Sequence, residues 1–447
     1  MSKIYFDHSA TTPVDKRVLE EMLPFFEDKF GNPSSVHNFG QAALEGVDQA
    51  RASLAQFLNC QPEEVIFTSG ATEANNLVLK GVAKALQPEP DKKVGSGDCM
   101  DITKEDVKKT KDKKGSWKGW LGKDRKESSL HVITSSVEHK SVLEPLAEME
   151  KQGVEITYLP VNSQGLVNPE DLKNAIKDNT VLVSLMYVNS EIGSKQPVRE
   201  AGKIIKKINE SRYSEWQKKG ARKQEPKPQP VYFHIDATQA VNFFTCDIEY
   251  LHADFLSLSG HKIYGPKGVG ALFIRQDSKI KGIQEGGGQE KKLRSGTLNT
   301  PGIVGLGRAI DLITPKKQKE HSGRISALRD RLVEGIKKNI EDVVLITDRE
   351  QSSPAHAHML FKGVEGESLL ISLDLEGIAV STGSACASRD LHSSYVLKAM
   401  GVGAEEANNA VRFTLGKHNT EDEIDKLLEK LPPIVARIRK MNPLYKK

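Results

Sequence analysis

Short apolar runs alternate with stretches of helical periodicity from residue 41 to residue 274. The apolar runs are rich in β-branched and aromatic residues, which is typical of buried strands, and cover residues 65–68, 131–135, 155–159, 181–187, 232–236, 253–258 and 268–274. Helical spacing of apolar residues covers residues 41–58, 169–176 and 198–209, and two further helices begin near residues 72 and 139. This alternation predicts a mainly parallel sheet flanked by helices on both faces.

The two ends of the chain carry a different pattern. A short strand at residues 5–9 precedes an amphipathic helix over residues 14–30, and a long charged helix over residues 316–338 follows one at 301–313. Beyond it we expect a smaller α+β domain, with strands at residues 343–347, 358–361, 378–380 and 411–415 and helices at 367–376 and 420–440. We therefore predict a large domain over residues 15–315 and a small domain made of residues 1–14 together with 316–447.

Two lysine-rich segments interrupt the large domain, at about residues 88–129 and 211–230. Both are polar and lack aliphatic periodicity, so we expect basic surface insertions that fold weakly. Trp117 and Trp120 in the first segment would dock a partner or the parent domain, or form a small local cluster. A solvated decoration without function is the simpler interpretation of both segments.

Composition limits the classes of function. The net charge of +4 over 447 residues is only mildly basic, which gives no reason to expect direct nucleic-acid binding. No apolar run reaches the ~20 residues of a membrane helix, and the four cysteines form no C-x-x-C pair that would indicate a disulfide framework or a metal site. We expect a cytoplasmic protein without a metal.

A lysine between two predicted strands carries the first chemical signal. Lys262 lies in a glycine-rich turn, where a buried strand gives way to a loop. Desolvation there would lower the pKa of its amine and allow it to form a Schiff base with an aldehyde. Asp236 ends a preceding strand and could pair with the pyridinium nitrogen of pyridoxal 5'-phosphate (PLP), which needs a carboxylate there. A surface lysine with its charge in water is the alternative, but the two residues together favour PLP.

Further residues fit the same chemistry. Thr72 lies where a strand passes through Gly70 into a helix, an arrangement typical of a phosphate cup, although an ordinary capped helix has the same pattern. His139 lies at another junction of strand and helix, where an imidazole either is structural or stacks on a cofactor ring and moves protons. Cys386 lies in a loop of small, hydroxylated residues, which favours an accessible nucleophile over a passive thiol.

These motifs resemble the cysteine desulfurases of group I, which are class V aminotransferase-like enzymes of PLP fold type I. The resemblance covers nearly the whole chain apart from the two insertions, and the motifs follow the order of the family. They are residues 7–13, 68–73, 138–140, 236–239, 259–262, 294–297, and 384–386 with 394–397.

The resemblance implies a role for each matching residue. Lys262 would hold PLP, Asp236 would pair with its pyridinium nitrogen, and His139 would stack on its ring and assist proton transfer. Gln239 would bond the phenolic oxygen, where Ser190 replaces the family's usual asparagine. The phosphate would be held by Ala71, Thr72, Ser259 and His261, and by Thr297 of the other subunit of a homodimer. Arg412 would pair with the substrate carboxylate, and Cys386 would be the catalytic cysteine.

The implied reaction is the removal of sulfur from L-cysteine. Lys262 would take the α-proton and the Cys386 thiolate would attack the substrate sulfur, which leaves L-alanine and a persulfide on Cys386. The sulfur would pass to an acceptor protein, such as an iron–sulfur scaffold or a tRNA-thiolation enzyme. The alternatives are a selenocysteine lyase or another class V PLP enzyme, and a non-catalytic scaffold or binding protein that retains the fold.

Overall fold

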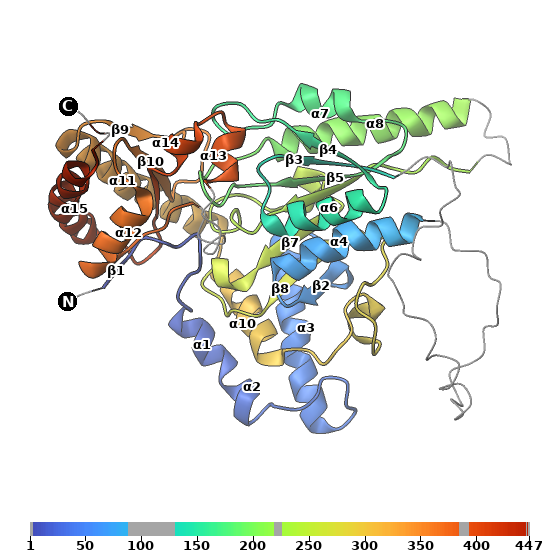
Figure 1. Ribbon diagram of the computed structural model, residues 1–447. Helices are drawn as coiled ribbons and strands as arrows, with labels where there is room; N and C mark the ends of the chain where they lie inside the picture. The colour runs from blue at the N-terminus through green and yellow to red at the C-terminus, as the bar shows by residue number, and fades with distance from the viewer. Residues whose placement is uncertain (1–2, 88–129, 219–225, 384–392, 444, 446–447) are drawn as a thin grey trace, which may run out of the picture.

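The computed structural model describes residues 3–87, 130–218, 226–383, 393–443 and 445. The first predicted insertion, residues 88–129, lies outside them, as does Cys386. Two groups of strands and helices make up the described chain (Figure 1). The larger group has an apolar core on each face of its sheet, and the smaller group has a core of its own. No helix of the described residues is long and apolar enough to cross a membrane.

The larger sheet has seven strands in the order β2-β8-β7-β6-β5-β3-β4. Only β8 runs antiparallel to its neighbours, so the predicted mainly parallel sheet is confirmed. Every residue of β2, β3, β5, β6, β7 and β8 is buried, which explains why these strands are rich in apolar residues on both faces. The strands are β2 (Val65–Thr68), β3 (His131–Ser135), β4 (Glu155–Leu159), β5 (Thr180–Met186), β6 (Tyr232–Asp236), β7 (Phe255–Ser259) and β8 (Gly270–Ile274).

Helices cover both faces of this sheet, because successive side chains of each strand point to opposite sides. Val132 packs with α4 (Ala71–Leu86) and α6 (Lys140–Lys151) in one core. The next residue, Ile133, belongs to the other core, with α3 (Asn38–Leu58), α8 (Val198–Lys218) and α10 (Thr300–Asp311). Short elements complete this part of the chain: α7 (Pro169–Ala175), α9 (Ile248–Leu251), and the 3₁₀ turns η1 (Pro62–Glu64), η3 (Gly260–Lys262) and η4 (Gln289–Lys292).

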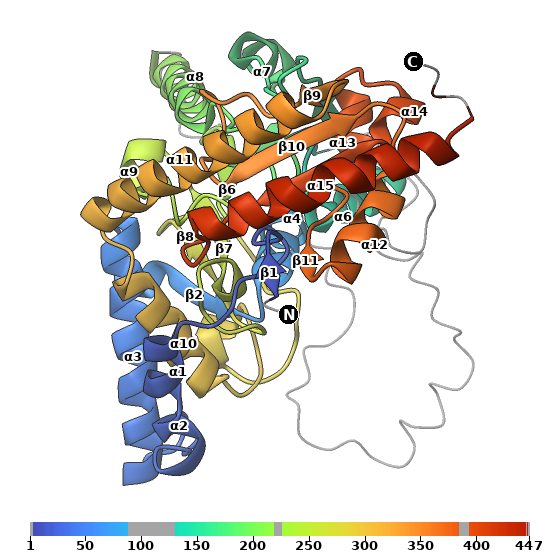
Figure 2. The same ribbon diagram turned by 90° about the vertical axis from the view of Figure 1, so that its left-hand side faces the viewer.

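The second group of elements joins the two ends of the chain. An antiparallel sheet of order β12-β10-β9 and a parallel pair of β1 with β11 share one core with three helices (Figure 2). The strands are β1 (Ile4–Tyr5), β9 (Val343–Leu345), β10 (His356–Phe361), β11 (Ile378–Ala379) and β12 (Ala410–Thr414), and the helices are α11 (Pro315–Asn339), α12 (Gly366–Leu375) and α15 (Glu421–Met441). Two short helices, α13 (Tyr395–Ala399) and α14 (Ala404–Ala407), pack in a small apolar cluster with Val137, Met186 and Ile192 of the larger group. The predicted division at residues 15–315 stays a proposal, which these separate cores support.

Two predicted segments differ from the structure. The single helix expected over residues 14–30 is two helices, α1 (Lys16–Met22) and α2 (Pro24–Glu27), because Pro24 cannot continue the hydrogen-bond ladder of α1. The second insertion was expected to begin at residue 211, but α8 continues to Lys218. The last buried residue of α8 is Ile205. Helix propensity and the stacked rings of Tyr213 and Trp216 therefore support the turns of α8 that follow it.

Candidate active site

A cavity of about 980 Å³ opens at the carboxyl edge of the parallel strands. Its walls come from the loops after β2, β3, β5, β6 and β7, from the N-terminal segment and from β12. This is the edge at which the sequence predicts a ligand. The predicted site residues that line it are Ala71, Thr72, His139, Ser190, Asp236, Gln239, Ser259, His261, Lys262 and Arg412.

Asp236 ends β6 on the floor of the cavity and is only 6% exposed. Its Oδ2 accepts a hydrogen bond from Asn75 Nδ2 at 2.8 Å, and its Oδ1 accepts from the backbone N–H and the hydroxyl of Thr238. Both partners are neutral, so they fix the carboxylate without balancing its charge. The negative charge therefore remains to attract a cation in the cavity.

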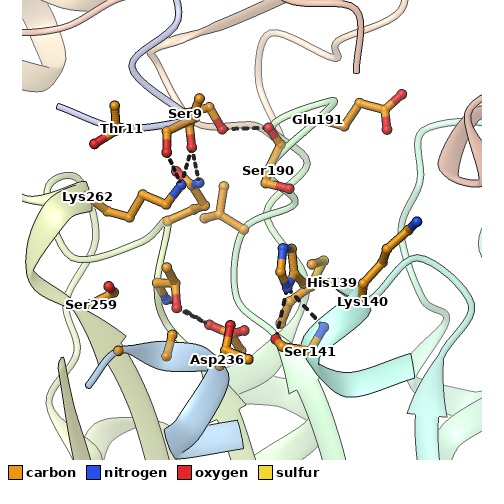
Figure 3. A pocket seen from close by; sticks show the side chains of 18 of the residues that line it. Ser9, Thr11, His139, Lys140, Ser141, Ser190, Glu191, Asp236, Ser259 and Lys262 are labelled. Carbon is orange, nitrogen blue, oxygen red and sulfur yellow. Dashed lines mark hydrogen bonds between the residues drawn. The ribbon is translucent and has the colours of Figure 1, made fainter. Parts of the chain in front are cut away.

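Lys262 reaches the cavity from η3, directly after β7 (Figure 3). Its Nζ donates to the carbonyl oxygens of Ser9 and Ala10 at 2.5 and 2.7 Å. Asn242 Nδ2 donates to the Lys262 carbonyl at 2.8 Å and fixes the backbone from the other side. The amine is thus directed toward the N-terminal segment by groups that accept hydrogen bonds only.

The N-terminus of α4 forms the candidate phosphate cup. Gly70, the residue before the helix, has a φ of 154°, a conformation that L side chains rarely adopt. The backbone N–H groups of the first turn have no partner inside a helix and favour an anion. Ser259 and His261 line the same cavity. Burial, together with the charges of Lys262 and Lys267, lowers the pKa of His261 to about 4, so its ring is neutral at neutral pH.

His139 is linked to Asp236 by a chain of hydrogen bonds. Asn75 Nδ2 donates to the Ser141 hydroxyl at 2.8 Å. That hydroxyl lies 2.9 Å from His139 Nδ1 (Figure 3). The backbone N–H of Ser141 also donates to Nδ1, at 3.1 Å. Because Nδ1 accepts this bond, the ring proton of the neutral histidine is on Nε2.

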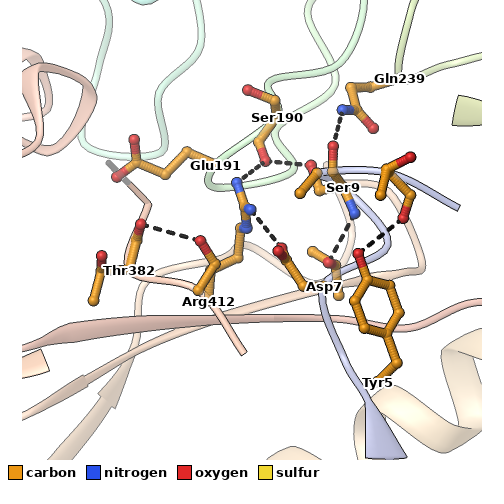
Figure 4. Close-up of polar contacts among 12 residues, drawn as sticks. Tyr5, Asp7, Ser9, Ser190, Glu191, Gln239, Thr382 and Arg412 are labelled. Atoms are coloured by element: carbon orange, nitrogen blue, oxygen red, sulfur yellow. Dashed lines mark hydrogen bonds and ion pairs between the residues drawn. The ribbon is translucent and has the colours of Figure 1, made fainter. Parts of the chain in front are cut away.

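Arg412 lies on β12 and is 5% exposed, with its guanidinium at the cavity wall (Figure 4). Its Nη2 donates to Asp7 Oδ1 at 2.7 Å and its Nη1 donates to the Ser190 carbonyl at 2.9 Å. Ser9 Oγ donates to that same carbonyl at 2.6 Å. The guanidinium is therefore held in one orientation, as recognition of a carboxylate by two parallel hydrogen bonds requires.

Two buried acids adjoin the site. Burial raises the pKa of Glu191, which lines the cavity, to about 7, although Arg412 and a hydrogen bond with Ser394 act in the opposite direction. Burial likewise raises the pKa of Glu138 to about 8, despite donors at Ser135 Oγ and Met186 N–H. Both side chains hold a proton more readily than an exposed carboxyl does.

Two of the predicted site residues are not among those that line this cavity. Thr297 is exposed and does not line the cavity of its own chain. The prediction places it at the phosphate site of the other subunit of a homodimer. Cys386 lies outside the described residues, although Gly383 and Ser393 on either side of that segment line the cavity. The predicted roles of these and the other site residues remain proposals.

Sequence reasoning missed several residues that shape the site. Asn75 holds Asp236 and Ser141, and the signal for it is a polar residue on the apolar face of α4 beside Ala74 and Val78. Asp7 orients Arg412 and Ser9 contacts Lys262, yet both were recognised only as parts of a motif. These two contacts depend on the N-terminal segment meeting β12 and η3, which no local pattern reveals.

The comparison with known proteins agrees with this geometry. The model of the aminotransferase class-V family matches residues 4–96, 119–212 and 222–427. The cysteine desulfurase IscS of Dictyoglomus turgidum is 41% identical over 441 residues, which cover 99% of this chain and 96% of the relative. The protein of the same name from Methanosarcina thermophila is 41% identical over 444 residues, which cover 99% of this chain and 95% of that relative.

Solved structures are similar as well. A NifS-like protein superposes with a TM-score of 0.79 at 34% identity, covering 98% of this chain and all of that one. The structure titled "SspA in complex with cysteine" has a TM-score of 0.71 at 30% identity and covers 94% of this chain and all of its own. The fold, the full-length matches and the arrangement of the cavity together show that this chain belongs to the class-V aminotransferase family and, within it, to the cysteine desulfurases.

Proposed function

We propose that the protein is a PLP-dependent cysteine desulfurase that takes sulfur from L-cysteine and releases L-alanine. The observation that carries the proposal is a single cavity in which an amine (Lys262), an uncompensated carboxylate (Asp236) and a guanidinium (Arg412) face the same space. A cofactor with an aldehyde and a protonatable ring nitrogen suits the first two groups, and an amino acid substrate suits the third.

The residues present fit PLP. Lys262 would hold it covalently, and the charge of Asp236, balanced only by neutral donors, would pair with the ring nitrogen. The first turn of α4, with Ala71 and Thr72, and the side chains of Ser259 and His261 would hold its phosphate. His139 would stack on the ring, and Gln239 and Ser190 would lie near the phenolic oxygen. When bound, PLP withdraws electrons from the carbon atoms of the substrate.

Arg412 would bind and orient the substrate carboxylate. Asp7 and the Ser190 carbonyl already occupy two of its donors, which fixes the plane of the guanidinium before the substrate arrives. A prearranged donor loses less conformational entropy when it binds. Lys262 would take the α-proton, and His139, which holds its proton on Nε2, would act in proton transfer at the same face of the cavity.

Cys386 would be the nucleophile. Its thiolate forms a bond to the substrate sulfur as the bond between that sulfur and carbon breaks, and a proton added at that carbon completes alanine. Of the other cysteines, Cys60 and Cys246 are poor candidates, because burial raises the pKa of each thiol to about 12. The persulfide on Cys386 would be passed to an acceptor protein, for which an iron–sulfur scaffold or a tRNA-thiolation enzyme is the expectation.

The protein would work as a homodimer in the cytoplasm. Apolar side chains with large exposed fractions follow one another between α1 and α2, on α2 and up to the start of α3, namely Leu23 (53%), Phe26 (59%), Phe30 (64%), Val36 (93%) and Phe39 (56%). A second copy of the chain would cover them and bring its Thr297 to the phosphate site. Light scattering on the wild type and on Val36→Asp tests this: a dimer that becomes monomeric agrees, and a wild-type monomer contradicts it.

The test of function compares wild type with Cys386→Ser and Lys262→Ala. Wild type with L-cysteine and a reductant should release sulfide and alanine in equal amounts. Cys386→Ser should keep the visible absorbance of the lysine-bound cofactor and release neither product, whereas Lys262→Ala should lose that absorbance. A coloured wild type that is inert with L-cysteine would refute the substrate, and selenocysteine would be tried next.

A further inference from the structure

A second cavity, of about 330 Å³, lies where the chain leaves Lys262. Ile263 and Tyr264 line it together with the end of α10, the first turns of α11 and Lys417, which follows β12 (Figure 2 shows these helices). Its volume is at the lower end of the roughly 300–1,000 Å³ that small-molecule sites span. None of its lining residues belongs to the first cavity.

Positive charge dominates the lining of this second cavity. Arg17, Lys317, Arg324 and Lys417 line it, and Glu320 is the one carboxylate among the described lining residues. A second carboxylate, Asp15, lies behind the wall, where it pairs with both Arg17 and Lys417.

A histidine, His321, also lines this cavity. Burial and then the charges of Arg324 and Lys417 lower the pKa of His321 to about 4. Its ring is therefore neutral at neutral pH. A neutral imidazole takes no part in the charge balance of the cavity and can itself donate a hydrogen bond to a ligand or accept one from it.

The walls of the cavity are fixed before any ligand enters. Tyr264 has a φ of 62°, a conformation that is strained for a bulky residue, and its backbone N–H donates to Thr12 Oγ1 at 2.8 Å. Its hydroxyl accepts from the Lys417 N–H at 2.7 Å, and Lys417 Nζ lies 4.0 Å from the centre of its ring. Arg324 is anchored through the carbonyls of Asn419 and Lys417, at 2.9 and 2.6 Å.

We infer that this second cavity binds a small organic oxyanion, one that bears phosphate or carboxylate groups. Arg17 already forms a planar pair of hydrogen bonds with Asp15, so Lys317 and Arg324 supply the charge that attracts either kind of oxyanion. The space can hold an oxyanion of many atoms, since it equals the share of about eleven liquid water molecules at ~30 Å³ each. Ile263, Ala309 and Leu312 add an apolar wall for a carbon skeleton.

The site adjoins the catalytic lysine. Asn242, which lines the second cavity, donates to the Lys262 carbonyl, and Tyr264 follows Lys262 by two residues. An occupant would therefore contact the segment that positions the amine. The inference concerns binding alone and does not depend on the proposed function.

The experiment titrates cofactor-loaded protein with pyrophosphate and, separately, with citrate at matched ionic strength, with binding measured by calorimetry. Using the loaded protein keeps the phosphate cup of the first cavity filled. At least one probe should bind with one site per chain. Lys317→Glu should raise the dissociation constant of that probe roughly tenfold, because it reverses a charge in the wall. Lys319→Glu is the matched control: it makes the same change on the same helix outside the lining.

Each outcome of this titration either assigns the class of ligand or refutes the inference. Binding of pyrophosphate alone assigns the site to phosphate compounds, and binding of citrate alone assigns it to carboxylates. A second variant, Arg17→Gln, should also weaken binding, and circular dichroism checks that each variant is folded. If neither probe binds, or if Lys319→Glu weakens binding as much as Lys317→Glu does, the inference is wrong.

Discussion

Acid should destabilise the protein through two histidines of β10. His356 and His358 are 2% and 0% exposed, and in the described part of the chain neither ring nitrogen of His358 has a hydrogen-bond partner. Burial, and then the positive charge of Arg412, lowers the pKa of each ring to about 3. Both are neutral in the folded protein, whereas an unfolded histidine titrates near 6.5.

The sign and size of the effect follow from this difference. Between pH 6.5 and pH 3 the unfolded chain binds more protons than the folded chain, so the free energy of unfolding falls as the pH falls. At pH 5 a ring with pKa values of about 3 and 6.5 has lost about 2 kcal/mol of stability relative to neutral pH, at 1.36 kcal/mol per pH unit. The neighbouring Glu191 acts in the opposite direction, because its raised pKa makes it destabilising as the pH rises. A comparison of variants is therefore needed.

The assay is urea unfolding of wild type, His358→Gln and Met359→Leu at pH 7 and at pH 5. His358→Gln should lose about 2 kcal/mol less than wild type between the two pH values, since a glutamine takes up no proton. Met359→Leu changes the same buried strand without removing a titrating group, so it should follow wild type. An equal loss in wild type and His358→Gln would refute the reasoning that burial keeps this ring neutral.

Three further predictions concern the site. Asn75→Leu removes a donor to Asp236 and should raise the dissociation constant of PLP about tenfold in absorbance titrations, since a hydrogen bond to a charged group contributes about 1.5–3 kcal/mol; the neighbouring change Asn76→Ala, at a half-buried residue that does not contact Asp236, should change it little. Arg412→Lys should raise KM for L-cysteine at least about tenfold, because an ammonium cannot form the planar pair of bonds, and an unchanged KM would remove Arg412 from substrate binding. Cys246 should resist alkylation in the folded protein at pH 7.5 and react once urea unfolds it, because burial raises its pKa to about 12; rapid labelling under native conditions, read by peptide mass spectrometry, would contradict that.

The order of elements could be predicted because each buried strand and amphipathic helix has a local signature. The strands at residues 65–68, 131–135 and 155–159 have the predicted bounds, and Thr420 and Glu423 form the capping box that opens α15. The end of α8 was harder, because its last turns bury little and their apolar periodicity fades after Ile205.

The site could be predicted in its parts but not in its connections. Lys262 and Asp236 were recognisable because an amine and a carboxylate at strand ends suggest specific chemistry. The link from Asp236 through Asn75 and Ser141 to His139 depends on three separate elements meeting. Local periodicity carries no information on such contacts.

The central claim is that sulfur leaves L-cysteine for Cys386. The most direct measurement is mass spectrometry of the peptide that carries Cys386, after cofactor-loaded protein has reacted with a stoichiometric amount of L-cysteine without a reductant. The account predicts that this peptide becomes one sulfur atom heavier, that one alanine is released for each modified chain, and that Lys262→Ala shows neither. Alanine released with the added sulfur absent from Cys386, or present on another cysteine, would contradict it.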